Sequence, residues 1–79
     1  MEDNPSRGGR FTVELELREP AEAHFVMFEV ASGILVDQRT ERGSNKYRIE
    51  YNLYQVRTGV YALIVSAGNE RKQIKIIIE

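Results

Sequence analysis

Residues 57–65, RTGVYALIV, decide the fold class, because they are apolar on both faces of an extended chain. A strand with one face in water alternates between apolar and polar side chains, and this stretch does not alternate. Its polar, turn-forming start and continuous apolar run are typical of a strand buried between two neighbours. The pattern predicts a central strand, hydrogen-bonded on both edges, that turns Tyr61, Leu63 and Val65 toward a sandwich core.

Further segments on both sides of this stretch carry strand patterns. Residues 11–17, FTVELEL, and residues 46–53, KYRIEYNL, alternate strictly between apolar and polar side chains. The others are residues 24–30, HFVMFEV, residues 34–40, ILVDQRT, and residues 71–78, RKQIKIII. Turn-forming residues separate the segments about every 8–12 residues, and no stretch has a convincing helical period. The sequence therefore predicts an all-β fold, a small antiparallel β-sandwich.

The predicted core consists of the apolar residues that share one parity in each segment. In residues 24–30 both parities are largely apolar, and we assign Val26 and Phe28 to the core, on the same face as His24. The full predicted core is Phe11, Val13, Leu15, Leu17, Val26, Phe28, Tyr47, Ile49, Tyr51, Tyr61, Leu63, Val65, Ile74, Ile76 and Ile78. Their burial offsets a chain entropy of comparable size, so we expect a thin margin of stability.

Length and composition bound the classes of function. The chain has 79 residues, which suits one domain whose core is too small for a large buried catalytic cavity. Residues 1–9, MEDNPSRGG, are predicted to be a flexible linker ahead of a sandwich domain at residues 10–79. Lys and Arg number 11 against 12 Asp and Glu and are spread along the chain, which argues against binding of nucleic acid. The absence of Cys excludes disulfides, thiolate zinc sites and cysteine nucleophiles.

No constellation of catalytic or metal-binding residues is visible in the sequence, so we expect neither an enzyme nor a cofactor. His24 is the only histidine and has no carboxylate or serine in obvious register, so we expect a packed or surface histidine. Glu14 and Glu16 lie two apart on one strand face, which we interpret as a solvated charged face. Tyr54, in a connecting loop, is the tyrosine expected to expose its ring.

Several landmarks follow one another in an order that is specific as a set. Residues 4–17, NPSRGGRFTVELEL, read Asn-Pro, polar residues, glycine and a Phe-led strand. Residues 28–36, FEVASGILV, place a Ser-Gly turn between apolar residues. Residues 47–65, YRIEYNLYQVRTGVYALIV, hold an alternating strand, a linker and Gly-Val-Tyr, and residues 71–79, RKQIKIIIE, form a Lys-bearing apolar strand. In these features the chain resembles the C-terminal sorting domain family of the type IX (Por) secretion system of Bacteroidetes-type Gram-negative bacteria.

The resemblance implies an Ig-like sandwich of about seven strands with Greek-key connections. It implies a non-catalytic signal that directs export of a larger cargo protein, attached on its N-terminal side, across the outer membrane. The implied partners are the outer-membrane secretion translocon and a sortase-like surface peptidase, which removes the domain in or just ahead of residues 1–9. The implied route leads through the periplasm to the cell surface or to secretion. An alternative is an Ig-like carbohydrate- or protein-binding accessory module of a secreted enzyme, motivated by Tyr54.

The landmarks also nominate recognition residues. Those that the resemblance supplies are Asn4, Pro5, Gly9, Gly33, Gly59 and Tyr61. We expect Gly59 to permit a positive φ or a close strand approach, and Tyr61 to bury its ring while its hydroxyl finds a partner near the sheet's end. Lys72 and Lys75 are candidates for direct contact with the secretion machinery, and equally for preventing an exposed strand edge from pairing with another chain. At such an edge the β-prone last strand would allow a homodimer.

Overall fold

The computed structural model describes residues 9–53 and 56–79, and these form strands joined by turns and loops. The strands are β1 (Arg10–Glu16), β2 (Ala23–Glu29), β3 (Leu35–Glu41), β4 (Lys46–Asn52), β5 (Gly59–Ala67) and β6 (Glu70–Ile78). The predicted all-β class is confirmed. The expectation of about seven strands is wrong for the described residues, which form six. Within the same residues, no helix is long and apolar enough to cross a membrane.

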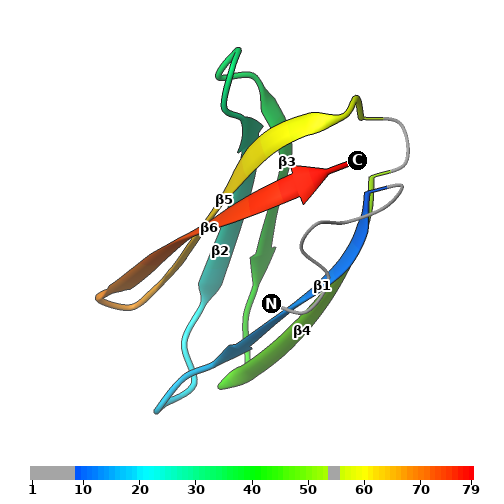
Figure 1. Cartoon of the computed structure of the whole chain (residues 1–79). Coiled ribbons are helices and arrows are strands. Elements are labelled where there is room, and N and C mark those ends of the chain that lie inside the picture. Colours follow the sequence, from blue (N-terminus) through cyan, green and yellow to red (C-terminus); the bar gives the residue numbers. More distant parts are fainter. Residues whose placement is uncertain (1–8, 54–55) are drawn as a thin grey trace.

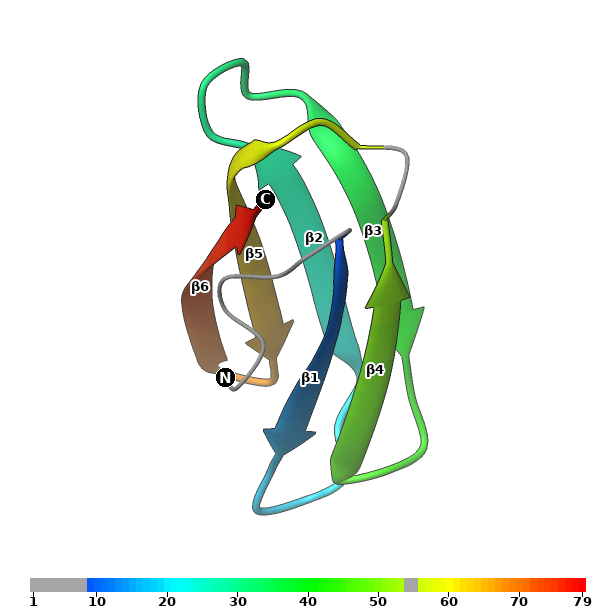
Figure 2. The same ribbon diagram turned by 45° about the vertical axis from the view of Figure 1, so that its right-hand side comes forward.

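Two antiparallel sheets make up the sandwich. One consists of β1 and β4, and the other has the order β3-β2-β5-β6. Figure 2 shows the β1–β4 pair lying in front of the four-stranded sheet. The chain crosses from β3 in the larger sheet to β4 in the smaller one and returns to β5 in the larger sheet. Strand β5 lies between β2 and β6, so its predicted central position is confirmed.

Strict alternation in β1 and β4 produces the smaller sheet. Each apolar residue of β1 lies opposite an apolar residue of β4, as in the pairs Phe11 with Tyr51 and Val13 with Ile49. The Phe11 and Tyr51 rings stack with their centroids 4.9 Å apart. All four of these side chains are buried, while the alternate residues face solvent. The predicted inward parity of both strands is therefore confirmed.

Strand β2 turns the opposite face to the core from the one predicted. Phe25 and Met27 are fully buried, whereas Val26 and Phe28 are half-buried on the outer face. Both parities of β2 are largely apolar, so alternation alone does not select one. Pairing with β5 selects it, because Phe25 lies opposite Val65 and cross-strand partners share a face.

The remaining core predictions differ from the structure only at the margin of the sandwich. Leu15 and Ile74 are partly buried and pack against the core instead of lying in it. Leu15 lies one residue before the end of β1, and Ile74 lies on β6, the last strand in the order of its sheet. The other predicted core residues are buried: Phe11, Val13, Leu17, Tyr47, Ile49, Tyr51, Tyr61, Leu63, Val65, Ile76 and Ile78. The division into a linker at residues 1–9 and a domain at residues 10–79 stays a prediction.

Candidate functional site

Two sequence landmarks that are distant in the chain, the Ser-Gly turn and the Gly-Val-Tyr segment, meet at one end of the four-stranded sheet. At this end β2 finishes, β3 and β5 begin, and the turn with Gly33 joins β2 to β3 (Figure 1). The first residues of β5 lie beside the last residues of β2, since Glu29 pairs with Tyr61. The Val30 amide donates a hydrogen bond of 3.0 Å to the Val60 carbonyl. We call the region of residues 29–35 and 59–61 the Gly-Val-Tyr end.

The Ser-Gly turn at this end is a closed hydrogen-bonded unit. Gly33 has φ +72°, and its amide donates to the Glu29 carbonyl at 2.7 Å. The Ser32 hydroxyl donates to Glu29 Oε1 at 2.6 Å and accepts from the Ile34 amide at 3.2 Å. Since an L side chain rarely adopts this φ, glycine suits the turn for its backbone. The turn holds the Glu29 carboxylate in a defined position at the sheet's end.

Tyr61 ties the start of β5 to the loop before it. Its side chain is 1% exposed, and its hydroxyl donates to the Arg57 carbonyl at 2.6 Å. The prediction that the ring is buried and the hydroxyl partnered is confirmed. Burial, with a further contribution from the negative charge of Glu29, raises the pKa of Tyr61, and the Arg57 charge acts in the opposite direction. A partner at the surface therefore does not touch this ring.

Gly59 begins β5 with φ +157°, at the border between extended backbone and the region that favours glycine. A Cβ built there lies 3.8 Å from Glu29 Oε2 and 3.9 Å from Tyr61 Cε1, which are ordinary contacts. The space around Gly59 thus accepts a small side chain. The predicted positive φ is present, and the close strand approach is not.

Four large apolar side chains stand exposed around the Gly-Val-Tyr end. These are Val30, Ile34, Leu35 and Val60, with exposed fractions of 53%, 63%, 52% and 39%. Among the described residues they are the exposed large hydrophobic side chains. Sequence reasoning missed them as a group, although apolar residues directly flanking a Ser-Gly turn were the available signal. We call them the aliphatic patch.

Gly9 requires glycine for a different reason. It has φ +72°, and its carbonyl accepts a hydrogen bond of 2.9 Å from the Leu53 amide, which joins the start of β1 to the end of β4. A Cβ at Gly9 would lie 2.5 Å from the Leu53 carbonyl oxygen, closer than real Cβ contacts. Asn4 and Pro5, the other landmarks of this segment, lie outside the described residues.

The two lysines of the last strand do not form one cationic surface. Lys72 and Lys75 are both exposed, but they differ in parity and therefore project from opposite faces of β6. Lys72 pairs with Val65 and shares the face of buried Ile76. Lys75 pairs with Ala62 on the outer face of the sheet. A single partner surface on one face thus contacts at most one of them.

His24 is a surface histidine, in agreement with the prediction that it is packed or on the surface. Its Nε2 lies 3.0 Å from Glu22 Oε1, and its Nδ1 lies 3.1 Å from Thr40 Oγ1. Arg42 Nη2 also approaches the Glu22 carboxylate, at 3.2 Å. Within residues 9–53 and 56–79, no three His, Cys, Asp or Glu side chains are grouped to hold a metal ion.

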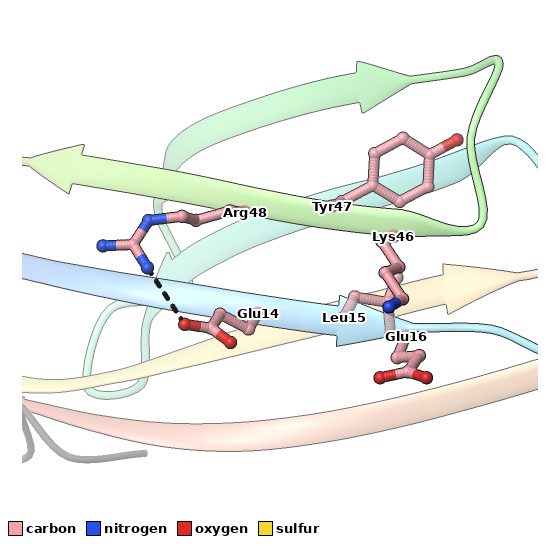
Figure 3. A pocket seen from close by; sticks show the side chains of 6 residues that line it. All are labelled: Glu14, Leu15, Glu16, Lys46, Tyr47 and Arg48. Carbon is pink, nitrogen blue, oxygen red and sulfur yellow. Dashed lines mark hydrogen bonds and ion pairs between the residues drawn. The ribbon is translucent and has the colours of Figure 1, made fainter.

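Glu14 and Glu16 lie on the outer face of the smaller sheet, as predicted. Side chains of β1 and β4 line a hollow of about 460 Å³ beside them. Figure 3 shows these side chains, with Arg48 of β4 reaching Glu14 of β1. Arg48 Nη1 donates to Glu14 Oε1 at 3.1 Å across the strands, and both side chains are well exposed. The paired carboxylates therefore belong to a solvated charged face with cross-strand ion pairing.

A polar face on β3 was not predicted. Asp37, Arg39 and Glu41 lie opposite core residues of β2 and so point to the inner side. The Arg39 guanidinium lies 5.1 Å from the centre of the Tyr51 ring. Burial raises the pKa of Tyr51 to about 12, against the opposing charge of Arg39. In the described part of the chain, the buried Tyr51 hydroxyl and Asp37 Oδ2 have no hydrogen-bond partner.

The described tyrosines offer no stacking platform for a sugar ring. Tyr47, Tyr51 and Tyr61 are all buried. Tyr54, which motivated the carbohydrate-binding alternative, lies outside the described residues. That alternative therefore has no support in the described geometry.

Comparison with known proteins gives one match. A family model described as a secretion system C-terminal sorting domain matches residues 4–79, almost the whole chain. The chain matches no curated protein and no solved structure.

Proposed function

The chain belongs to the secretion system C-terminal sorting domain family, and from this premise we propose how it acts on its cargo. Membership identifies it as a C-terminal sorting signal for type IX secretion, with a cargo protein on its N-terminal side and a destination across the outer membrane. We propose that the cargo passes through the periplasm with this domain folded. An outer-membrane translocon then selects the folded domain, and a surface peptidase removes it in or just ahead of residues 1–9.

The observation that carries the proposal is the match of the family model over residues 4–79. The geometry supports recognition of a folded shape. Gly33 is far in the chain from Gly59 and Tyr61, and the three residues lie together only after β2 and β5 have paired. The buried Tyr61 ring and the Gly33 turn act by shaping the surface, and an unfolded chain would not present that surface.

We propose that the domain is a signal and not a catalyst. Two exposed carboxylates are engaged in ion pairs, Glu14 with Arg48 and Glu22 with Arg42. The chemistry of sorting then belongs to the translocon and the peptidase, and this domain supplies the recognised surface.

The test is a reporter fusion in a bacterium with an active type IX system. A signal peptide, a fluorescent reporter, native upstream sequence and residues 1–79 are joined in that order. The reporter should reach the cell surface or the medium, and mass spectrometry of the released reporter should place its new C-terminus in or just ahead of residues 1–9. The matched control lacks β6, Glu70–Ile78, and should stay periplasmic, because it loses Ile76 and Ile78 from the core. Periplasmic retention of the complete fusion would contradict the proposal.

A further inference from the structure

The outer face of the four-stranded sheet is apolar at one end and polar at the other. Toward the Gly-Val-Tyr end, the cross-strand neighbours Leu35 and Phe28 lie near Val60 and Val30. At the opposite end, a row of polar residues crosses the same face. Thr40 of β3 pairs with His24 of β2, which pairs with Ser66 of β5, and Ser66 pairs with Arg71 of β6. The exposed large aliphatic side chains are therefore gathered at one end of the sheet, whereas the opposite end of this face is polar.

The size of the patch favours a transient heterologous contact. Four partly exposed aliphatic side chains present on the order of a few hundred Å², which is the size of the largest apolar patch on a typical monomer and is often functional. A stable complex buries about 800 Å² on each partner. The patch is thus too small to hold two copies of this chain together by itself. It suits a contact that forms and is released during transport.

The charge of the β2–β3 turn, which carries three of the four patch residues, favours a protein pocket over a lipid surface. The basic residues Arg57 and Lys75 lie on neighbouring segments, before β5 and on β6. The turn at residues 29–36, EVASGILV, contains no lysine, arginine, tryptophan or tyrosine. Attraction to anionic lipid headgroups needs basic residues, and aromatic residues anchor proteins at the membrane interface. The turn instead holds one carboxylate, Glu29, which Ser32 fixes through a hydrogen bond of 2.6 Å. A basic residue on the rim of an apolar pocket would complement that charge.

We propose that the aliphatic patch is the surface by which the secretion machinery reads this domain. The occupant of the patch is an apolar protein pocket with a basic rim, which receives the β2–β3 turn with Ile34 as its most exposed side chain. This inference rests on the proposed function. It separates two roles among the landmarks: Gly33 and Tyr61 shape the end of the sheet, and the aliphatic side chains beside them make the contact.

The test uses the reporter fusion with single substitutions. Ile34→Asp places a charge on the patch at a side chain that is 63% exposed, outside any strand, so the core is untouched. The matched control is Gln38→Asp, which adds the same charge at an exposed position of β3. In the complex Ile34 is buried in the partner's apolar pocket, so a charge at this position should lower surface delivery by about tenfold or more. Delivery of the control should match that of the parent. Ile34→Leu should restore delivery.

Each other outcome decides against a part of the proposal. If the parent fusion is delivered and Ile34→Asp is delivered equally, the patch is not read, although the proposed function stands. If the parent itself stays periplasmic, the proposed function fails and this inference fails with it. Should Ile34→Asp lower the thermal midpoint of purified residues 1–79, Leu35→Gln replaces it, and normal delivery of that variant overturns the inference.

Two measurements on purified residues 1–79 address other occupants. Flotation with vesicles of phosphatidylethanolamine and phosphatidylglycerol in equal parts should recover no domain. Recovery of the parent but not of Ile34→Asp would assign the patch to lipid and overturn the proposal. A dimer in light scattering that Ile34→Asp disrupts would assign the patch to a second copy, with the same consequence.

Discussion

Two buried tyrosines offer a comparison in which the same chemical change should have opposite results. Tyr61 is 1% exposed and its hydroxyl donates to the Arg57 carbonyl at 2.6 Å. Tyr51 is 3% exposed, and its hydroxyl has no hydrogen-bond partner among the described residues. Replacement by Phe removes only the hydroxyl in each case. The stacking of ring 51 on Phe11 and its contact with Arg39 should persist.

The magnitudes follow from the hydrogen bonds. A typical intramolecular hydrogen bond contributes about 0.5–1.5 kcal/mol to the free energy of unfolding, so Tyr61→Phe should lower it by about 1 kcal/mol. In a domain of this size that change lowers the thermal midpoint by about 4–8 °C. A buried hydroxyl without a partner costs about 1–3 kcal/mol, so Tyr51→Phe should leave stability unchanged or raise it.

The assay is thermal and urea unfolding of residues 1–79, followed by circular dichroism, for the parent and both variants. The slopes of the urea transitions should agree, which shows that the same surface is exposed on unfolding. If Tyr51→Phe destabilises the domain as much as Tyr61→Phe does, the assignment of one tethered and one unpaired hydroxyl is refuted.

Four further predictions use the same unfolding assays or light scattering. Gly9→Ala should lower the free energy of unfolding in urea by more than Gly33→Ala does. Both substitutions strain a positive φ, but only the Cβ at Gly9 meets backbone, 2.5 Å from the Leu53 carbonyl oxygen. Equal losses of stability would contradict this. Phe25→Ala should cost about 3–5 kcal/mol and Phe28→Ala clearly less, since only the first ring is fully buried; the reverse order would restore the original assignment of the β2 faces. Because the folded-state pKa of Tyr51 is raised from 10.0 to about 12, the unfolded chain releases this proton first, and the stability of the domain should fall as the pH rises from 10 toward 12. Between pH 10 and 12 the thermal midpoint should fall less in Tyr51→Phe than in the parent. Equal dependence of the midpoint on pH in the two proteins would exclude Tyr51 as the cause. Finally, β6 is the last strand of its sheet among the described residues, which is the position that the predicted homodimer requires. Light scattering at rising protein concentration should therefore show a dimer, and a monomer at every concentration would exclude the homodimer.

Alternation along the chain was enough to locate the strands. In β1 and β4 only one parity is apolar, so the inward face of Phe11 or Ile49 could be read without knowing the partner strand. The doubly apolar run of β5 was likewise enough to predict its central position, which the order β2-β5-β6 confirms. In these strands the local pattern and the tertiary environment demand the same arrangement.

Strands with an ambiguous pattern could not be resolved in this way. In β2 both parities are apolar, and only pairing with β5 turned Phe25 inward and left Phe28 on the outer face. In β3 the residues Asp37 and Arg39 point inward because their neighbours on β2 do, against their own polarity. The polarity of β3 alone does not predict this, since the register of a strand is set by its partner.

For the candidate site as well, some features follow from the sequence and others only from the tertiary structure. The sequence by itself determined that the chain is all-β, where its strands lie, and that residues 4–79 match its family, and it nominated Gly33, Gly59 and Tyr61 as landmarks. Only the tertiary structure decided that these landmarks meet at one end of a sheet and that Ile34 and Val60 are exposed beside them. The physical reason is that side-chain alternation is a local property of the backbone, whereas strand pairing joins residues far apart in the chain and decides which of two apolar faces is buried.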